Sequence, residues 1–389
     1  MGNIRGAKVK KEEPVKKSAL GRRDFMKIGA GTALTLSATT ARCVPILRAQ
    51  TQGKKSGANW WDAKPGPAGT GKPVSIDVHC HWAPTPYTDA LAELGHPVTN
   101  PFPLNYDLDK RIKWMDEHGV QQHCMTLAGG MPWQMQNAEE GAHLARIIND
   151  AGIEAHIAHP TRFLVGIELP PRDPQLALDE LNRCAGKPGV RAVHMVDSIE
   201  RHDYLFDQGW APVLARIEEL GYPILFHQMD GEPNAYGGAR NTGPLGLAMA
   251  LDAPIEHTVM ATKFIITGTL DKYPSLQIVL PHAGGAFPYL YGRVEHFLYH
   301  MRDPGAVKLE RPFREYIRRF YYDYLIYYPE AFRFLVSMVG VDRIVVGTDS
   351  FAAQDIDYPN NVLDQFNLPS ADRDRILRGN AMKILGLKG

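Results

Sequence analysis

The sequence has few cysteines, no net charge and no glycine-rich nucleotide motif. Four cysteines among 389 residues are too few for a disulfide framework. Lysine and arginine (43) balance aspartate and glutamate (43), which argues against a strongly basic nucleic-acid binder. The Gly-Gly pairs at 237–238 and 284–285 lack the spacing of a dinucleotide or P-loop motif. The ordinary apolar (44%) and charged (22%) fractions indicate a folded globular chain.

The charge is unevenly distributed along the chain. Residues 1–50 hold eleven basic and three acidic side chains, whereas residues 51–389 hold 32 and 40. Segment 22–27 (RRDFMK) precedes a mildly apolar run that is too short and too rich in glycine and threonine to span a membrane. These features predict a twin-arginine signal in residues 1–50, recognised by the twin-arginine export machinery and directing the protein to the periplasm. A disordered basic tail is the alternative.

The composition of residues 51–73, rich in glycine, proline and lysine, predicts a linker before a catalytic domain at 74–389. Short apolar, β-rich runs recur in this domain with helix-like segments between them, which predicts a (β/α)8 TIM barrel; an open doubly wound sheet is the alternative. Longer insertions at 82–109 and 229–257 are expected over the active-site face. The expected strands are Val74–His81, Gln122–Leu127, Phe163–Leu169, Val190–Val196, Pro223–Gln228, Gln277–His282, Phe320–Ile326 and Arg343–Asp349.

Ionisable side chains gather at the ends of these strands. Because strand side chains alternate, His79 and His81 should point to one side, with Asp77 one step deeper on the same side. Other expected strands end in His227, His282 and Asp349. A single histidine here would more often be a hydrogen-bonded core residue, but five such groups at the catalytic face of a barrel predict a metal site. Nitrogen and carboxylate ligands suit one divalent ion, with Zn²⁺ first and Mn²⁺ or Fe²⁺ as alternatives.

These motifs resemble those of the amidohydrolase-related (amidohydrolase 2) family. The similarity extends over nearly all of residues 74–389, and it is greatest to the branch that contains aminocarboxymuconate-semialdehyde decarboxylase and other aromatic-acid decarboxylases. Its anchors are DVHCH at 77–81, FH at 226–227, HAGGAFPYLYGR at 282–293 and GTD at 347–349.

The resemblance implies a metal-dependent barrel enzyme. His79, His81, His227 and Asp349 would hold the ion, and His282 would act as acid/base, with Asp349 as a proton partner. The resemblance also implies a homodimer, in which Arg293 would reach the neighbouring subunit's substrate carboxylate. Its alternative role is a surface salt bridge. Segment 82–109 departs from the branch because it contains no arginine.

Further polar and aromatic residues have weaker expected roles. Trp82 and Trp133 either stack on an aromatic substrate or pack within loops. Asp323 is expected to support a neighbouring group and His194 to be structural. Five histidines on expected helices should be solvated: His118, His143, His257, His296 and His300.

Three functions are compatible with this site. The first is decarboxylation of a small aromatic or unsaturated carboxylic acid. The second is hydrolysis of an amide, lactone or ester, and hydration of an unsaturated acid is a related variant. The third is a non-catalytic exported binding protein. The small-molecule substrate, the native metal and the choice between decarboxylation and hydrolysis are left open.

Overall fold

The computed structural model describes residues 74–98, 103–127, 136–200, 202–228, 247–350 and 363–387. The predicted export segment, the linker and Trp133 lie outside these residues. Within them, no helix has both the length and the apolar character to cross a membrane.

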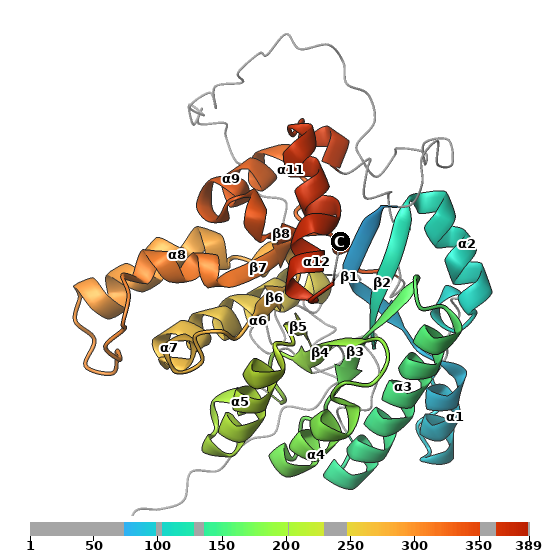
Figure 1. The fold of residues 1–389 in the computed structure, drawn as a ribbon. Helices are drawn as coiled ribbons and strands as arrows, with labels where there is room; N and C mark the ends of the chain where they lie inside the picture. The colour runs from blue at the N-terminus through green and yellow to red at the C-terminus, as the bar shows by residue number, and fades with distance from the viewer. Residues whose placement is uncertain are drawn as a thin grey trace, which may run out of the picture. The chain divides into compact units, whose positions relative to one another are not determined.

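Eight parallel strands form one sheet in sequential order, which confirms the predicted (β/α)8 barrel (Figure 1). Parallel bridges at Asp77–Val346 and Cys80–Ser350 bring the end of the sheet back to its first strand. The strands are β1 Ser75–Trp82, β2 Val120–Leu127, β3 Phe163–Glu168, β4 Val190–Val196, β5 Ile224–His227, β6 Ile278–Leu280, β7 Phe320–Asp323 and β8 Ile344–Val345.

Helices follow the strands and pack around them (Figure 1). The α4 helix shows why a helix begins where it does, since Asp173 accepts hydrogen bonds from the amides of Gln175 and Leu176, and Pro174 occupies the first turn. The helices are α1 Thr85–Glu93, α2 Leu108–His118, α3 Ala138–Ala158, α4 Pro174–Cys184, α5 Ala211–Leu220, α6 Leu247–Ile266, α7 Thr269–Lys272, α8 Phe287–Glu295, α9 Pro329–Val339, α11 Ser370–Asp374 and α12 Asn380–Ile384.

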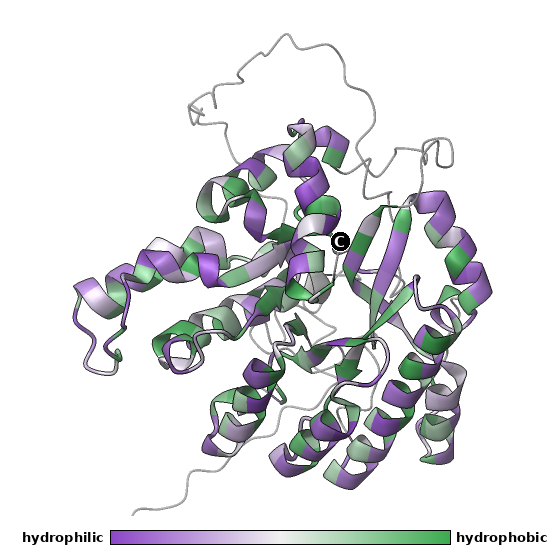
Figure 2. Ribbon diagram, in the orientation of Figure 1, coloured by the Kyte–Doolittle hydropathy of each residue, from purple (hydrophilic) through white to green (hydrophobic). Residues whose placement is uncertain are grey.

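The described residues form three hydrophobic clusters, two outside the strands and one inside the barrel. Helices α3, α4 and α5 carry both hydrophobic and hydrophilic residues, as expected for helices that bury one face (Figure 2). Inside the barrel, Ile76, Leu164 and Val279 belong to a cluster that also contains Ile384 and Leu385, at and just after the end of α12. The amino-terminal end of the barrel is therefore filled by apolar side chains, which leaves polar chemistry to the opposite end.

Candidate metal and acid–base site

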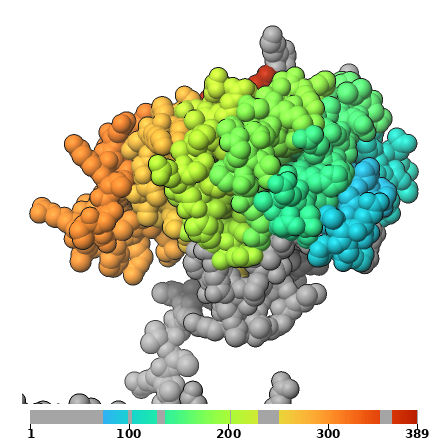
Figure 3. All heavy atoms as spheres, turned by 90° about the horizontal axis from the view of Figure 1, so that it is seen from below, coloured from blue at the N-terminus to red at the C-terminus, as the bar shows by residue number. Residues whose placement is uncertain are grey.

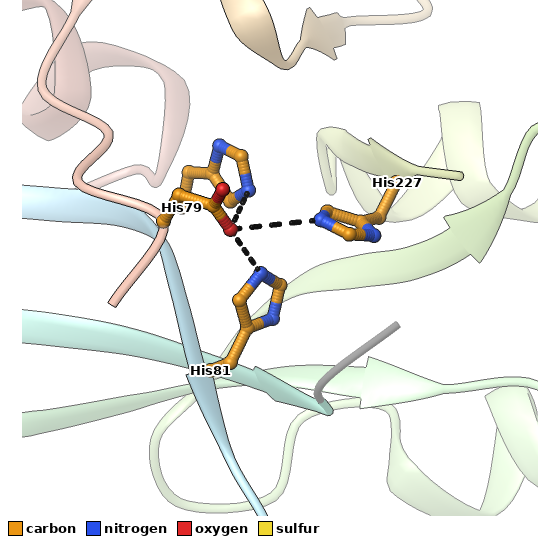
Figure 4. Close-up of side chains that lie close together, drawn as sticks. His79, His81 and His227 are labelled. Carbon is orange, nitrogen blue, oxygen red and sulfur yellow. Dashed lines mark hydrogen bonds and ion pairs between the residues drawn. The ribbon is translucent and has the colours of Figure 1, made fainter. Parts of the chain in front are cut away.

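Three imidazoles and one carboxylate meet at the carboxyl ends of β1, β5 and β8 (Figure 4). Oδ1 of Asp349 lies 3.3 Å from Nε2 of His79, 3.0 Å from Nε2 of His81 and 3.8 Å from Nε2 of His227. All four residues are buried, and their ligand atoms lie within 4.8 Å of one another. The structure thus brings together the four predicted metal ligands.

The geometry of this group fits one divalent ion. Bonds of 2.0–2.2 Å in a tetrahedral site place ligand atoms about 3.4 Å apart, close to the separations from Asp349. Among the described residues, Nε2 of His79 and Nε2 of His227 are buried without a hydrogen-bond partner. Metal coordination would give both nitrogen atoms a partner. A buried polar atom without a partner destabilises the folded protein.

Each ligand histidine is oriented through its other ring nitrogen. Nδ1 of His79 contacts Asp323 Oδ2 at 2.7 Å. Nδ1 of His81 lies 2.9 Å from the Leu127 carbonyl, and Nδ1 of His227 lies 2.9 Å from the Gln228 carbonyl. These acceptors keep the proton on Nδ1 and leave Nε2 free for a metal.

A β-bulge in β1 determines the direction in which His79 and His81 point. Asp77 pairs with His123 and Cys80 with Met125, so β1 contains one more residue than β2 between these pairs. His79 and His81 both reach the metal site, as predicted. The prediction that Asp77 shares their side is wrong, because the extra residue changes the alternation.

The Asp77 side chain belongs to a separate buried network. Its Oδ2 accepts a hydrogen bond from Thr348 Oγ1 at 2.5 Å and lies 3.7 Å from His123 Nε2. Burial raises the pKa of Asp77 to about 6. Arg111, fully buried on α2, donates from Nε to His123 and from Nη1 to the His81 carbonyl. This network supports the β1 backbone behind the metal ligands.

The predicted acid–base residue His282 sits on a strained turn after β6. Its Nε2 lies 3.4 Å from Asp349 Oδ2, the carboxylate oxygen not directed at the histidine cluster. His282 and Ala283 both have positive φ (50° and 55°), a conformation unfavourable for side-chain-bearing residues. The Asp323 carboxylate accepts hydrogen bonds from both of their amides, at 2.9 and 2.7 Å. Asp323 therefore supports the turn as well as His79, which confirms its expected supporting role.

The electrostatics of the cluster favour a bound cation. Burial lowers the pKa of His79, but the Asp349 and Asp323 carboxylates more than offset this and raise it to about 10. Burial, and then the neighbouring His227, lower the pKa of His81 to about 3. Burial opposes ionisation of Asp349, yet the surrounding histidines hold its pKa well below the usual range. Without a metal, protonated His79 supplies the positive charge beside the two carboxylates.

The prediction for His257 is wrong. This α6 residue is fully buried rather than solvated, with Nδ1 against Asp197 Oδ2 and Nε2 2.8 Å from His282 Nδ1. Its helical position gave no sign of this contact, because it depends on how α6 packs against the barrel. His194 is buried and paired with Glu168 at 2.7 Å, consistent with the expected structural role.

The two predicted substrate-binding residues lie away from the cluster. Trp82 is buried on the opposite face of β1 from His81, in an apolar cluster with Leu144 and Ile148, which favours its packing alternative. Arg293 is exposed on α8, and its guanidinium lies 4.7 Å from the centre of the Phe297 ring. The structure therefore does not bring Arg293 to the metal site of its own chain.

Comparisons with known proteins agree with this architecture. The chain matches the amidohydrolase family over residues 76–387. It is 26% identical to 2-amino-3-carboxymuconate-6-semialdehyde decarboxylase from Dictyostelium discoideum, covering 82% of this chain and 86% of that one.

Two solved structures have the same fold. The first is 5-carboxyvanillate decarboxylase from Sphingomonas paucimobilis (TM-score 0.67, 25% identity), with 82% of this chain and 100% of that chain covered. The second is a dihydroxybenzoic acid decarboxylase from Polaromonas sp. JS666 with bound manganese (TM-score 0.67, 24% identity, 80% and 96% covered).

Proposed function

Because the chain belongs to the amidohydrolase family, we propose that it is a divalent-metal-dependent decarboxylase of a small aromatic or unsaturated carboxylic acid. The observation that carries this proposal is the buried group of three imidazole Nε2 atoms around Asp349 Oδ1, with His282 Nε2 beside the other oxygen of the same carboxylate. The relatives named above support it, since all three are decarboxylases.

The proposed cofactor is one ion held by His79, His81, His227 and Asp349. Zn²⁺ is the first choice for three imidazoles and a carboxylate, with Mn²⁺ and Fe²⁺ as alternatives. Manganese gains support from the Polaromonas relative that contains it. When bound, such an ion acts as a Lewis acid on a substrate oxygen.

The protein residues then manage one proton. Decarboxylation breaks the bond between a substrate carbon and its carboxylate, and the bonding electron pair must receive a proton at that carbon as CO₂ leaves. His282 Nε2 is the donor, because it faces the cluster while Nδ1 is turned toward His257. Asp349 Oδ2, 3.4 Å from Nε2, orients the ring. Water supplies the proton that restores His282 for the next turnover.

The test is a screen of metal-loaded protein against hydroxybenzoates, unsaturated acids, lactones and amides. Release of CO₂ from an acid, without hydrolysis of the lactones or amides, supports the proposal; hydrolysis alone contradicts it. His282→Asn should abolish CO₂ release while the protein retains its metal. His143→Asn, at an exposed histidine on α3, is the matched control and should keep full activity.

We also propose a homodimer that uses the surface of α8 and the following π-helix, His296–His300. Tyr289, Phe297 and Met301 are large apolar side chains exposed in this region, and Arg293 stands among them. Figure 3 shows this part of the chain, in orange, projecting at one side of the molecule. In the dimer, Arg293 would bind the substrate carboxylate of the partner subunit through its guanidinium fork.

Subunit complementation tests this assembly. Arg293→Gln and His282→Asn subunits should each be inactive alone. Mixed dimers would hold one intact site, so co-refolded subunits should recover up to about a quarter of wild-type activity. A monomer at micromolar concentration, or no recovery in proven mixed dimers, would contradict the proposal.

The export prediction remains a proposal as well. The twin-arginine segment 22–27 would direct the folded protein to the periplasm through the twin-arginine machinery. Replacing both arginines with lysine should retain the protein in the cytoplasm, whereas a change of Lys16 and Lys17 to Gln should not. Equal periplasmic recovery of the two variants would refute it.

A further inference from the structure

A chain of three polar groups extends from the metal cluster toward the helices, and its last two members, His257 and Asp197, are buried. It begins at His282, passes through His257 on α6 and ends at Asp197, which directly follows β4. Nε2 of His257 lies 2.8 Å from Nδ1 of His282, and Nδ1 of His257 contacts the Asp197 carboxylate. The two imidazole rings are stacked, with centroids 5.0 Å apart.

We propose that Asp197 and His257 are positioning residues that hold His282 with its proton on Nδ1 and with Nε2 as the working atom. This inference rests on the proposed function, because it assigns His282 its direction of proton transfer. It adds two residues to the site that are not among the four proposed ligands, although the Asp197 amide donates a hydrogen bond to the His227 carbonyl at 3.1 Å.

The hydrogen-bond chain determines which nitrogen of each ring carries a proton. A carboxylate can only accept, so contact with Asp197 places the His257 proton on Nδ1. Burial, reinforced by the neighbouring His282, holds the pKa of His257 well below its usual value, so this ring is neutral and its Nε2 is an acceptor. His282 must then donate from Nδ1. Its Nε2 then takes a proton from water, holds it facing Asp349 Oδ2 at 3.4 Å as the imidazolium, and delivers it to the substrate carbon.

In the opposite arrangement, both hydrogen bonds of the chain run in the reverse direction. It requires a proton on Asp197, whose burial raises the pKa of that carboxyl. His257 would then donate from Nε2, and His282 Nδ1 would carry no proton. The two arrangements differ in one measurable property, the protonation of His282 Nδ1.

The backbone around His282 is held as firmly as its ring. A Cβ added to Gly285 would lie only 2.0 Å from the Pro254 carbonyl oxygen, so this turn is pressed against α6 next to His257. Thr258 Oγ1 also accepts a hydrogen bond from the Ala286 amide at 2.9 Å. A strained turn fixed from one side by Asp323 and from the other by α6 is expected where the orientation of one side chain determines function.

The first test separates positioning from simple packing. His257→Leu removes the acceptor for His282 Nδ1, whereas the carbonyl of His257→Gln can replace it. We expect Leu to lower kcat by about 10²- to 10⁴-fold, the usual contribution of general acid–base catalysis. KM and metal content should stay within threefold, and Gln should recover at least tenfold over Leu.

His156→Leu is the matched control, since His156 also lies on a helix and contacts a backbone carbonyl through Nδ1, at 2.6 Å from Phe163. It should leave kcat unchanged. A Leu variant that loses thermal stability but keeps kcat within threefold, or a Gln variant no better than Leu, would show that His257 is only a structural brace. If Leu does not fold, the comparison of Gln with wild type and the spectra below decide.

The second test does not depend on any substrate. Histidine labelled with ¹⁵N in the zinc-loaded, full-length protein reports the tautomer of each ring through long-range ¹H–¹⁵N correlations. The proposal requires a protonated Nδ1 on both His257 and His282, with the His282 signal altered in His257→Leu. A bare Nδ1 on His282 in the wild-type protein would overturn it. Because these spectra require no turnover, they stand even if no acid in the screen is decarboxylated.

Discussion

Replacing Asp323 with asparagine should weaken both the metal site and the fold. The two carboxylate oxygens of Asp323 accept four hydrogen bonds. Oδ2 accepts from His79 Nδ1 (2.7 Å) and the His282 amide (2.9 Å), and Oδ1 accepts from the amides of Ala283 (2.7 Å) and Leu325 (3.1 Å). An asparagine has only one oxygen, so either orientation of its amide sets an NH₂ group against two donors.

The magnitude follows from the unpaired donors. Each buried donor without an acceptor costs about 1–3 kcal/mol, so Asp323→Asn should lower the free energy of unfolding by about 2–6 kcal/mol. If the amide replaces Oδ2, His79 also loses the acceptor that keeps its proton on Nδ1. Loss of such support typically weakens metal binding 10- to 100-fold, or about 1.4–2.8 kcal/mol.

The assay is metal competition with a chromophoric chelator on stripped protein, together with thermal unfolding. Asp116→Asn is the control, since Asp116 is exposed and pairs with Arg162 at 2.8 Å. It should change stability by less than about 1 kcal/mol and leave metal affinity unchanged. An Asp323→Asn protein that binds metal within threefold of wild type and unfolds like the control would refute the reasoning.

Three further predictions concern the same site. At pH 7 to 9, metal binding should release about one proton from His79, whose metal-free pKa is about 10, and calorimetry in buffers of different ionisation enthalpy measures this number. The raised pKa of His79 also makes the stability of the metal-free protein depend on pH. Protonated His79 contributes its full stabilisation below pH 6.5, and this contribution is lost as the pH rises through about 10. Unfolding curves measured across this pH range check the prediction. Gly347→Ala should reduce metal affinity, because the new Cβ would lie 2.7 Å from the Cβ atoms of His79 and Asp323; an unchanged dissociation constant would contradict this. Trp82→Ala should cost about 3–5 kcal/mol of stability, whereas Trp82→Phe should leave KM unchanged; a raised KM in a stable Phe variant would restore its substrate-stacking alternative.

Most of the barrel could be predicted because its strands are buried on both faces. Val190–Val196, for example, is apolar at five of its seven positions and buried at six, and the predicted range matches β4. Two of the later strands end earlier than predicted. β6 stops at Leu280 and β8 at Val345, although apolar residues continue beyond β8. Apolar character signals burial, but the hydrogen bonding that defines a strand depends on the neighbouring chain.

The site was predictable where it depends on position along a strand and unpredictable where it depends on tertiary packing. His81 is the penultimate residue of β1 and His227 the last residue of β5, so their location followed from the pattern. The side of β1 on which Asp77 lies could not be predicted, because a strict alternation of side chains does not account for the extra residue in β1. The contact of His257 with His282 joins α6 to the turn after β6 across 25 residues, and no local periodicity encodes it.

The proposed ion would lie across the seam where the barrel closes. Strand β8 is only two residues long, and beyond it the chain returns to β1 through single bridges. Asp349 lies between these two bridges; it has a positive φ of 56°, and its amide donates to the His79 carbonyl at 2.8 Å. An ion shared by Asp349 and the β1 histidines therefore joins two edges that meet through isolated bridges rather than through a continuous ladder. The stability of the seam and the alignment of Asp349 with His282 then depend on the same ligands, so weakening of the site by mutation should loosen barrel closure as well as catalysis.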